Sequence, residues 1–373
     1  MLIGVPKEIK TLEYRVGLVP SSVKELTSRG HSVLIETNAG LGINFTDKDY
    51  EEAGAKIVGT AKEIFDKSEM IIKVKEPQAQ ECAMLQEDQI LFTYLHLAAD
   101  APQAKQLIES GCVAIAYETV TGPNGHGLPL LEPMSEIAGR LSVQVGAYYL
   151  QKHMGGLGRL VGGVPGVKPA EILILGGGVA GFHAAQMATG LGANVTILER
   201  SNPRMRFLDE YFHGRANIVY SNLDILEREV MNADLVIGAV LIPGASAPKL
   251  IRKDMLPTMK KGAVIVDIAI DQGGCFETSK PTTHDNPTYV IDDVVHYCVA
   301  NMPGAVPLTS ALALNHSVLP YALRLADQGW KNALEGDSNF LNGLNICQGK
   351  VTNEAVAQSL NLDFAPAKTC LAA

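Results

Sequence analysis

The feature that most constrains this fold is a glycine-rich turn near the middle of the chain. Residues 172–175 are Ile-Leu-Ile-Leu, and Gly176, Gly178 and Gly181 follow in the G-x-G-x-x-G spacing. A helix-compatible run continues to Leu191, and a second apolar segment at 195–198 ends at Glu199. This order of strand, glycines, helix, strand and acid is typical of a βαβ unit that binds a dinucleotide.

Each part of this fingerprint has a physical role. Gly176 permits the tight turn, Gly178 lets the backbone approach a pyrophosphate, and Gly181 lets helix and strand pack closely. Free N–H groups at the start of the helix face the phosphates. Glu199 lies 18 residues after Gly181, near where a carboxylate accepts hydrogen bonds from ribose hydroxyls. The alternative is a glycine-rich turn in an unrelated α/β sheet.

The position of the fingerprint predicts the domain organisation. It follows a region of domain size in a chain of 373 residues, which is long enough for two cores. The first part alternates strand and helix signals, and a long helix is expected over residues 133–153. The sequence therefore predicts an α/β protein with two mostly parallel sheets flanked by helices. A Rossmann domain at residues 131–306 would be inserted into a discontinuous substrate domain formed by residues 1–130 and 307–373.

Composition excludes several classes of function. The formal charge is −9 and no long Lys/Arg run occurs, which argues against nucleic-acid binding. No apolar run reaches the ~18 residues of a membrane span, and residues 1–8 lack the apolar core of a signal peptide. The six cysteines form no C-x-x-C pair, and the nine histidines show no zinc-site spacing. We therefore expect a cytoplasmic protein with reduced thiols and no metal site.

Candidate chemistry is expected at the carboxyl ends of the strands, where open α/β sheets bind ligands. The predicted strands at 70–75, 90–96 and 265–271 end in Lys75, His96 and Asp271, and Arg15 lies in the loop after the first strand. Hydride transfer on a small acid needs a cation for the carboxylate and a group that titrates near neutrality. Each residue has an ordinary structural alternative: a solvated lysine, a hydrogen-bonded histidine, or an Asx-turn at Asp271.

A set of short motifs lies at residues 1–10, 13–17, 74–77, 93–98, 133–139, 175–181, 266–274 and 296–307. Taken together, these motifs resemble the alanine dehydrogenase family of NAD-dependent enzymes, which convert L-alanine to pyruvate and ammonia. The resemblance spans residues 1 to about 330 in order. The resemblance implies an L-specific enzyme and a homohexamer. Because the glycine loop lies in one predicted domain and Arg15, Lys75 and His96 in the other, we expect hydride transfer in a cleft between the domains.

The resemblance also implies a role for each matching residue. Arg15 and Lys75 would hold the substrate carboxylate, with Asn301 at the edge of the site, and His96 and Asp271 would form the acid/base pair. The residues that would surround the cofactor are Ser135, Gly176, Gly178, Val179, Ala180, Gly181, Glu199, Arg204, Ser221, Val240, Leu250, Ile268, Asp271 and Met302.

One departure and three rival functions stay open at this point. Relatives commonly place aspartate where this chain has Glu199, and the neighbouring Arg200 leaves some use of NADP possible. The rival functions are the nucleotide-binding component of a transhydrogenase, a saccharopine-type dehydrogenase, and an NAD-binding sensor without catalysis. NADH oxidation with pyruvate and ammonia separates all of them.

Overall fold

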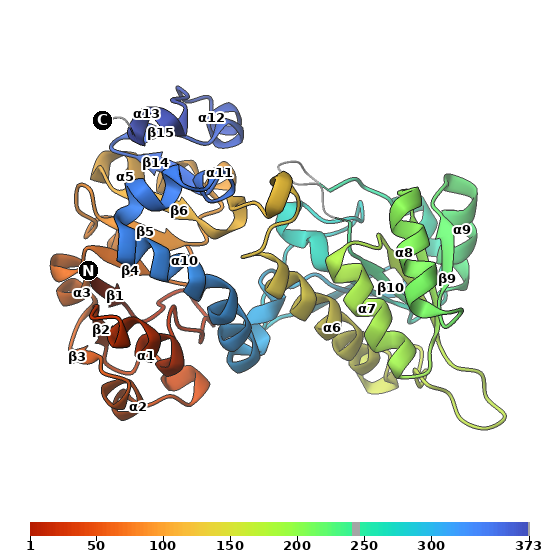
Figure 1. The fold of residues 1–373 in the computed structure, drawn as a ribbon. Helices are drawn as coiled ribbons and strands as arrows, with labels where there is room; N and C mark the ends of the chain where they lie inside the picture. The colour runs from red at the N-terminus through yellow and green to blue at the C-terminus, as the bar shows by residue number, and fades with distance from the viewer. Residues whose placement is uncertain (241–246, 372–373) are drawn as a thin grey trace. The chain divides into compact units, whose positions relative to one another are not determined.

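The computed structural model describes residues 1–240 and 247–371, and its chain divides into two compact units. Unit 1 comprises Met1–Met134 and Val306–Ala373, and unit 2 comprises Ser135–Ala305. Both chain termini belong to unit 1 (Figure 1). The sequence predicts the first boundary between the units after residue 130, four residues earlier than in the structure. It predicts the second boundary after residue 306, one residue later than in the structure.

Unit 1 contains an eight-stranded sheet in the order β15-β14-β6-β5-β4-β1-β2-β3. Strands β1 to β6 are parallel, and β14 and β15 are antiparallel additions at one edge. The chain reverses its direction of strand addition between β1 and β4, which makes that junction the topological switch point. The strand bounds are β1 Leu2–Val5, β2 Ser32–Glu36, β3 Lys56–Val58, β4 Met70–Ile72, β5 Ile90–Thr93, β6 Val113–Ala116, β14 Leu344–Cys347 and β15 Lys350–Val351.

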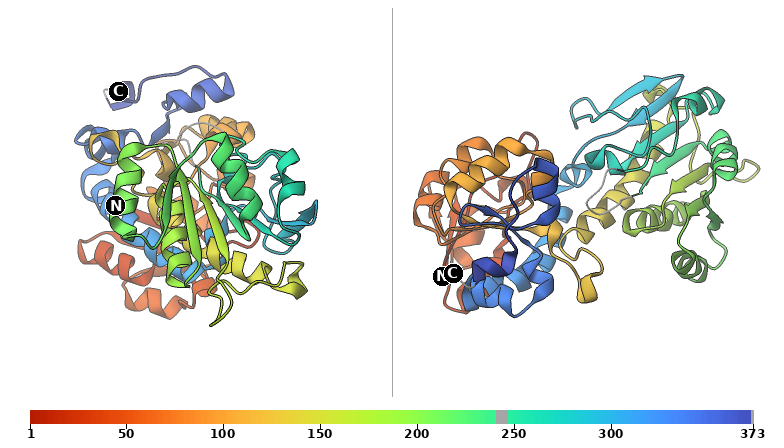
Figure 2. Two further views of the ribbon diagram at one scale, coloured as in Figure 1. Left: turned by 90° about the vertical axis from the view of Figure 1, so that its right-hand side faces the viewer. Right: turned by 90° about the horizontal axis from the view of Figure 1, so that it is seen from above.

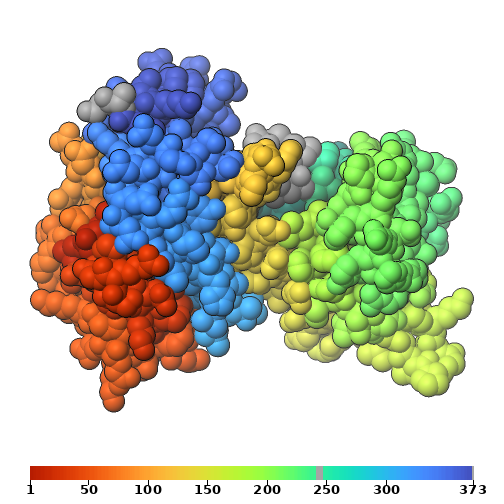
Figure 3. Space-filling model, in the orientation of Figure 1, coloured from red at the N-terminus to blue at the C-terminus, as the bar shows by residue number. Residues whose placement is uncertain are grey.

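Helices from both ends of the chain cover the sheet of unit 1. They are α1 Pro20–Ser28, α2 Asp47–Glu52, α3 Ala61–Lys67, α4 Ala79–Cys82, α5 Ala101–Ser110, α10 Pro307–Glu335, α11 Ser338–Leu341, α12 Glu354–Leu360 and α13 Ala367–Leu371. Helices α3, α5 and α12 contribute Phe65, Leu107 and Val356 to a core that also contains Leu91. Red and blue atoms lie side by side on this unit in Figure 3, because residues from both chain ends form its surface.

Unit 2 contains a seven-stranded sheet in the order β12-β13-β11-β10-β7-β8-β9. All neighbours are parallel except β12, which pairs antiparallel with β13. The switch point lies between β7 and β10, the arrangement of a dinucleotide-binding fold. The bounds are β7 Glu171–Leu175, β8 Asn194–Glu199, β9 Asn217–Tyr220, β10 Leu235–Gly238, β11 Val264–Asp267, β12 Thr288–Ile291 and β13 Val294–Tyr297, with helices α6 Glu132–Tyr149, whose first three residues belong to unit 1, α7 Val179–Gly190, α8 Asn202–Phe212 and α9 Leu223–Asn232.

The central strands β7, β10 and β11 of unit 2 are buried along nearly their whole length, and helices flank the green strands of this unit in Figure 2. Leu173 and Val236 pack on one face with Leu226 and Val230 of α9. On the other face, α7 lies against Ile174 at Gly181, and α6 lies against Leu235 at Gly146. Burial on both faces explains why β7, β10 and β11 are continuous apolar runs rather than alternating ones. The predicted fold class is confirmed.

Several predicted element bounds were wrong. The long helix expected over 133–153 ends at Tyr149, and the strands expected to reach Lys75 and His96 end at Ile72 and Thr93. Strands β3, β9, β13, β14 and β15 were not predicted. Within the parts of the chain described here, no helix has the combination of length and apolar character that crossing a membrane requires. All six cysteines are buried and free of disulfides.

Candidate functional site

The glycine loop between β7 and α7 has the geometry that the fingerprint predicts. Gly176 has a φ of +90°, a left-handed conformation that suits glycine. A Cβ at Gly181 would lie 1.9 Å from the carbonyl oxygen of Gly176, so helix and strand pack closely only without a side chain there. A Cβ at Gly178 would have nothing within 4 Å. Gly178 is also the N-cap of α7 and supplies no side chain to it, so an approaching anion would meet the helix N-terminus.

Glu199 ends β8, and its carboxylate turns back toward the glycine loop. It accepts a hydrogen bond from the Gly177 N–H at 2.9 Å and from the N–H groups of Arg200 and Ser201 at 2.7 and 2.9 Å. Arg204, in the first turn of α8, donates from Nε to the Gly177 carbonyl at 2.5 Å, and its guanidinium lies over the Phe207 ring at 4.6 Å. Glu199 therefore binds the N–H of Gly177, and Arg204 binds its carbonyl.

The other predicted cofactor residues of unit 2 mostly follow the carboxyl ends of its parallel strands. Ser221 comes directly after β9, Val240 shortly after β10 and Ile268 directly after β11. Val179 and Ala180 begin α7. Leu250 donates its N–H to the Cys275 carbonyl at 2.8 Å, and Cys275 donates from Sγ to the Val240 carbonyl at 3.7 Å. Ser135 lies in the first turn of α6 and Met302 is buried at the start of η8 (Met302–Ala305).

Arg15 is buried in unit 1, in the long loop between β1 and α1, with 2% of its surface exposed. Its Nε and Nη2 atoms each lie 2.6 Å from an oxygen of Glu13, a bidentate ion pair, and Nη1 lies 3.2 Å from the Met134 sulfur. Burial alone would lower the pKa of Arg15, but the hydrogen bonds and charge of Glu13 outweigh it and raise the pKa. Arg15 is therefore a fixed cation in a protein interior.

Lys75 lies three residues beyond the end of β4, next to the switch point of unit 1. Its ammonium is 3.4 Å from Glu76 Oε2, and its side chain is 12% exposed. Glu76 also pairs with Lys10. The peptide of Lys75 is anchored on both sides, because its N–H donates to Glu8 at 3.3 Å and its carbonyl accepts from the Thr93 hydroxyl at 3.0 Å.

His96 is exposed and sits in a left-handed backbone conformation, with φ 51° and ψ 36°. Such a conformation is uncommon outside glycine and costs energy, so surrounding contacts must impose it. Glu118, in η3 (Tyr117–Thr119) after β6, accepts from the His96 N–H at 2.6 Å and from the Leu95 N–H at 3.2 Å. The imidazole stacks on the Tyr94 ring, with centroids 5.8 Å apart and planes 8° from parallel.

Asp271 does not end a strand, contrary to the prediction. Strand β11 ends at Asp267, and Asp271 is exposed in the 3-10 turn η7 (Ile268–Gln272). Asp267 caps this turn by accepting from Ala269 N at 3.1 Å, and it also accepts from Cys275 N at 2.9 Å and the Ser279 hydroxyl at 2.5 Å. Burial raises the pKa of Asp267 to about 6, although these hydrogen bonds act in the opposite direction. Asn301 has a φ of 63°, and its carbonyl accepts from Gly304 N at 2.9 Å.

The structure thus groups the predicted residues by unit. Arg15, Lys75 and His96 follow β1, β4 and β5, which are neighbours in the sheet of unit 1. Asp271, Asn301 and the cofactor residues belong to unit 2. Sequence reasoning missed the acids Glu8, Glu118 and Asp267, which bind the backbone of these loops. A carboxylate that accepts backbone N–H groups leaves no spacing signal, because its partners are peptide groups common to every residue.

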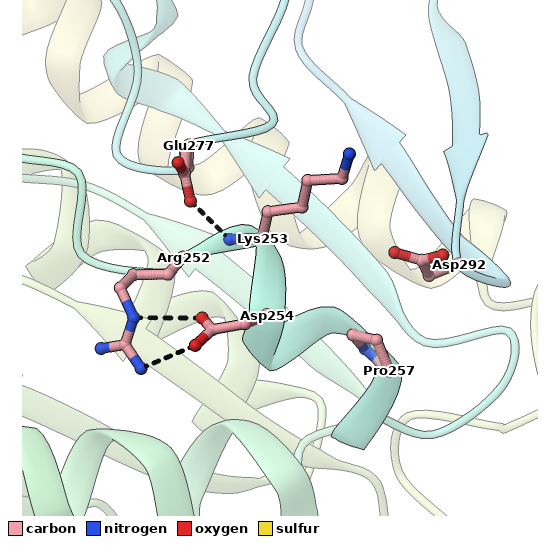
Figure 4. A pocket seen from close by; sticks show the side chains of 6 residues that line it. All are labelled: Arg252, Lys253, Asp254, Pro257, Glu277 and Asp292. Atoms are coloured by element: carbon pink, nitrogen blue, oxygen red, sulfur yellow. Dashed lines mark hydrogen bonds and ion pairs between the residues drawn. The ribbon is translucent and has the colours of Figure 1, made fainter.

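A shallow, open depression on unit 2 is unrelated to these residues (Figure 4). It is lined by Arg252, Lys253, Asp254, Pro257, Glu277 and Asp292. Arg252 pairs with Asp254, with Nε 3.0 Å from Oδ1, and Glu277 accepts from the Lys253 backbone N–H at 2.7 Å. Asp292 precedes β13 at its amino end, whereas the glycine loop follows the carboxyl end of β7. The depression therefore does not coincide with the predicted cofactor site.

Comparison with known proteins gives full-length matches. The family model described as Alanine dehydrogenase/PNT, N-terminal domain matches residues 4–138, and that described as Alanine dehydrogenase/PNT, C-terminal domain matches residues 142–354. An alanine dehydrogenase of Halomonas elongata is 56% identical over 371 residues, which cover 100% of each chain. A solved structure of an L-alanine dehydrogenase is 54% identical with a TM-score of 0.93, covering 97% of this chain and 99% of that chain.

A more distant likeness concerns the fold alone. The crystal structure of a transhydrogenase from Sinorhizobium meliloti has a TM-score of 0.82 at 24% identity, covering 94% of this chain and 100% of that chain. The two family models occur in sequence order and together match nearly the whole chain. With these matches and an identity of 56% over its full length, the chain belongs to the alanine dehydrogenase/PNT family.

Proposed function

We infer that the chain is an NAD-dependent alanine dehydrogenase, which converts L-alanine to pyruvate and ammonia and catalyses the reverse amination. The observation that carries this conclusion is the full-length identity of 56% to a curated alanine dehydrogenase. The glycine loop at the carboxyl edge of the unit 2 sheet supports the same conclusion, because this is where such folds bind dinucleotides.

The residues of unit 2 fit NAD. The space at Gly178 admits a pyrophosphate to the N-terminus of α7, and the close packing at Gly181 keeps that helix in place. We propose that Glu199 contacts the ribose and that Ser135, Ser221, Val240, Leu250, Ile268 and Met302 surround the rest of the cofactor. When bound, NAD supplies the hydride acceptor.

We propose that Arg15 and Lys75 hold the carboxylate of alanine, with Asn301 at the edge of the site. Both cations come from the loops at the switch point of unit 1, where ligands of such sheets bind. The bidentate pair with Glu13 fixes the plane of the Arg15 guanidinium before substrate arrives. A pre-oriented cation loses little side-chain entropy on binding a carboxylate.

We propose that His96 and Asp271 act as the acid/base pair. The ammonium of alanine must lose a proton before hydride leaves its α-carbon, because a positive nitrogen disfavours the developing iminium. Water then adds to the imine carbon, and His96 moves protons as the carbinolamine releases ammonia and forms pyruvate. Hydride transfer requires alanine and NAD to be held in contact, and exclusion of water from the reacting atoms favours the transfer.

We also propose a homohexamer, as the family resemblance implies, and a cytoplasmic location, as the composition suggests. Sedimentation velocity tests the assembly, because a hexamer gives a particle mass six times that of one chain, whereas a dimer or a monomer gives a smaller mass. Fractionation of the source cells tests the location.

The experiment that tests the activity is NADH oxidation with pyruvate and ammonia, run beside lysine with 2-oxoglutarate and beside a control without substrate. Oxidation only in the first reaction supports alanine dehydrogenase. Oxidation only with lysine and 2-oxoglutarate indicates a saccharopine-type enzyme. Binding of NADH without oxidation in any reaction contradicts the proposal and points to a transhydrogenase component or a sensor.

A further inference from the structure

A buried ion cluster lies beside Lys75 and is used by none of the steps above. The Lys73 ammonium is 3.0 Å from Glu8 Oε2 and 2.7 Å from Glu81 Oε1. The three side chains are 0%, 2% and 1% exposed. Glu8 comes from the loop after β1, Lys73 directly follows β4, and Glu81 lies in α4. The cluster therefore joins the two loops of the unit 1 switch point.

The charge state of the cluster follows from its burial. Burial alone would lower the pKa of Lys73, but the two carboxylates outweigh it and raise the pKa, so the ammonium stays charged. Burial raises the pKa of Glu8 above its ordinary value even though Lys73 opposes the shift. Two acids thus compete for one cation in a protein interior, which is an expensive arrangement. Apolar residues of similar volume often replace such clusters without loss of stability.

The second oxygen of Glu8 explains what the cluster achieves. Glu8 Oε1 accepts from the Val74 N–H at 2.7 Å and from the Lys75 N–H at 3.3 Å. Glu81 makes no corresponding contact, since its Oε2 accepts from Gln78 N at 2.8 Å within its own helix cap. Lys73 thereby fixes the Glu8 carboxylate, and the carboxylate fixes two consecutive peptide groups that lead into the Lys75 side chain.

The carbonyl group of Lys75 is fixed as well. The hydroxyl of Thr93, which is fully buried at the end of β5, donates to the Lys75 carbonyl at 3.0 Å. Lys75 is outside the sheet ladder, so these two side chains replace the strand contacts that would otherwise define its backbone. The Nζ atom of a lysine is placed only as well as the backbone that carries it.

We propose that Glu8 is a positioning residue for Lys75, held in place by Lys73 and assisted by Thr93, and that this cluster sets the affinity for the substrate carboxylate. The inference rests on the proposed role of Lys75 in binding substrate. Glu81 neutralises and orients Lys73 and caps α4 through Gln78. The two buried acids of the cluster therefore differ in function although they share one cation.

The test compares Glu8→Gln with its matched control Glu81→Gln in the full-length enzyme. Each variant removes one of the two carboxylate charges that face Lys73, so the two variants change the charge of the ion cluster equally. Glu8→Gln raises the KM for pyruvate on the order of tenfold, the factor that one hydrogen bond to a charged group contributes. Glu81→Gln leaves the KM near the wild-type value. The Kd for NADH, measured by fluorescence titration, stays unchanged in both.

Two further variants keep the proposal testable if Glu8→Gln does not fold. Thr93→Val replaces a hydroxyl with a methyl group of similar size, leaves the ion cluster intact, and also raises the KM for pyruvate. In a Lys75→Met background, Glu8→Gln or Thr93→Val produces no additional rise, because residues that act through one side chain are not additive.

The outcomes separate this inference from the proposed function. An equal change in KM for Glu8→Gln and Glu81→Gln overturns the positioning role, and so does a full additional rise in the Lys75→Met background. If Lys75→Met itself leaves pyruvate kinetics unchanged, the substrate-binding role of Lys75 fails and the positioning role fails with it. The assay for alanine dehydrogenase activity is independent of either result.

Discussion

Two glycines of the fingerprint, three residues apart, should respond oppositely to the same substitution. In Gly181→Ala the new Cβ would lie 1.9 Å from the Gly176 carbonyl oxygen, 3.0 Å from its carbon and 3.3 Å from Ile174 Cγ2. A normal contact to that oxygen is well beyond 3 Å, so the first turn of α7 must move away from β7 by more than an ångström. No side-chain rotation relieves the clash, because the opposing atom belongs to the backbone.

The size of the effect follows from the packing around α7. Inserting a methyl group into a well-packed interior typically costs about 1–3 kcal/mol. The upper part of that range applies here because the clash is with main chain. For a unit of this size, each kcal/mol shifts the thermal midpoint by about 2–4 °C. We therefore expect Gly181→Ala to lower the midpoint of unit 2 by roughly 4–12 °C and to weaken NADH binding, since the helix N-terminus moves.

Gly178→Ala is the matched control, because its Cβ would meet no atom within 4 Å and its φ of −62° suits alanine. Its stability should equal or exceed that of the wild type by up to about 1 kcal/mol. NADH binding should still weaken, because the methyl group occupies the path of the pyrophosphate. Differential scanning calorimetry and NADH fluorescence titration measure the two effects. The reasoning is refuted if Gly181→Ala melts like the wild type, or if Gly178→Ala binds NADH normally.

Three further predictions follow from the site. His96→Ala should bind NADH normally yet lose about 10²- to 10⁴-fold in turnover of pyruvate amination, whereas wild-type turnover would remove His96 from the mechanism. Glu199→Ala should weaken NADH binding in titrations while NADPH binding changes less; an equal loss for both would exclude a role at the ribose. Because burial raises the folded-state pKa of Asp267 to about 6, stability linked to this group is present below its ordinary pKa and is lost as pH rises through 6. We therefore compare the free energy of unfolding in urea of the wild type and of Asp267→Asn at pH 4 and pH 7. Relative to the variant, the wild type should be less stable at pH 7 than at pH 4, by at most about 3 kcal/mol. A difference between the two proteins that does not change with pH would contradict this.

Much of the fold was predictable because its strongest signals are local. The apolar runs of β7 and β10 are buried on both faces, and the glycine spacing marks a turn whose geometry permits few other residues. Strands β3 and β9 were missed because they are short and partly exposed, so neither periodicity nor composition separates them from loops. Strand β14 was missed because it adds to the sheet of unit 1 from the far end of the chain, a pairing that sequence does not encode locally.

The site was predicted less completely, because strand ends depend on partners distant in sequence. The apolar pattern continues past Ile72 and Thr93, and Val74 and Leu95 are fully buried, so the pattern predicts longer strands. Beyond these strand ends, carboxylates bind the next N–H groups of the chain. Glu8 binds Val74 and Lys75 across 66 and 67 residues, and Glu118 binds Leu95 and His96 across 23 and 22 residues.

These carboxylate contacts also explain why the candidate substrate-binding and catalytic residues lie just beyond the ends of the strands. A residue within a strand has its peptide groups fixed by neighbouring strands and its side chain directed into a packed face. A residue just beyond the strand, held instead by a buried carboxylate, keeps a fixed backbone while its side chain is released from the sheet. His96 can adopt its left-handed conformation only there, since a ladder would exclude it. Removing such a carboxylate should therefore affect ligand binding or turnover before it affects the fold, which is the pattern to seek in Glu118→Gln as in Glu8→Gln.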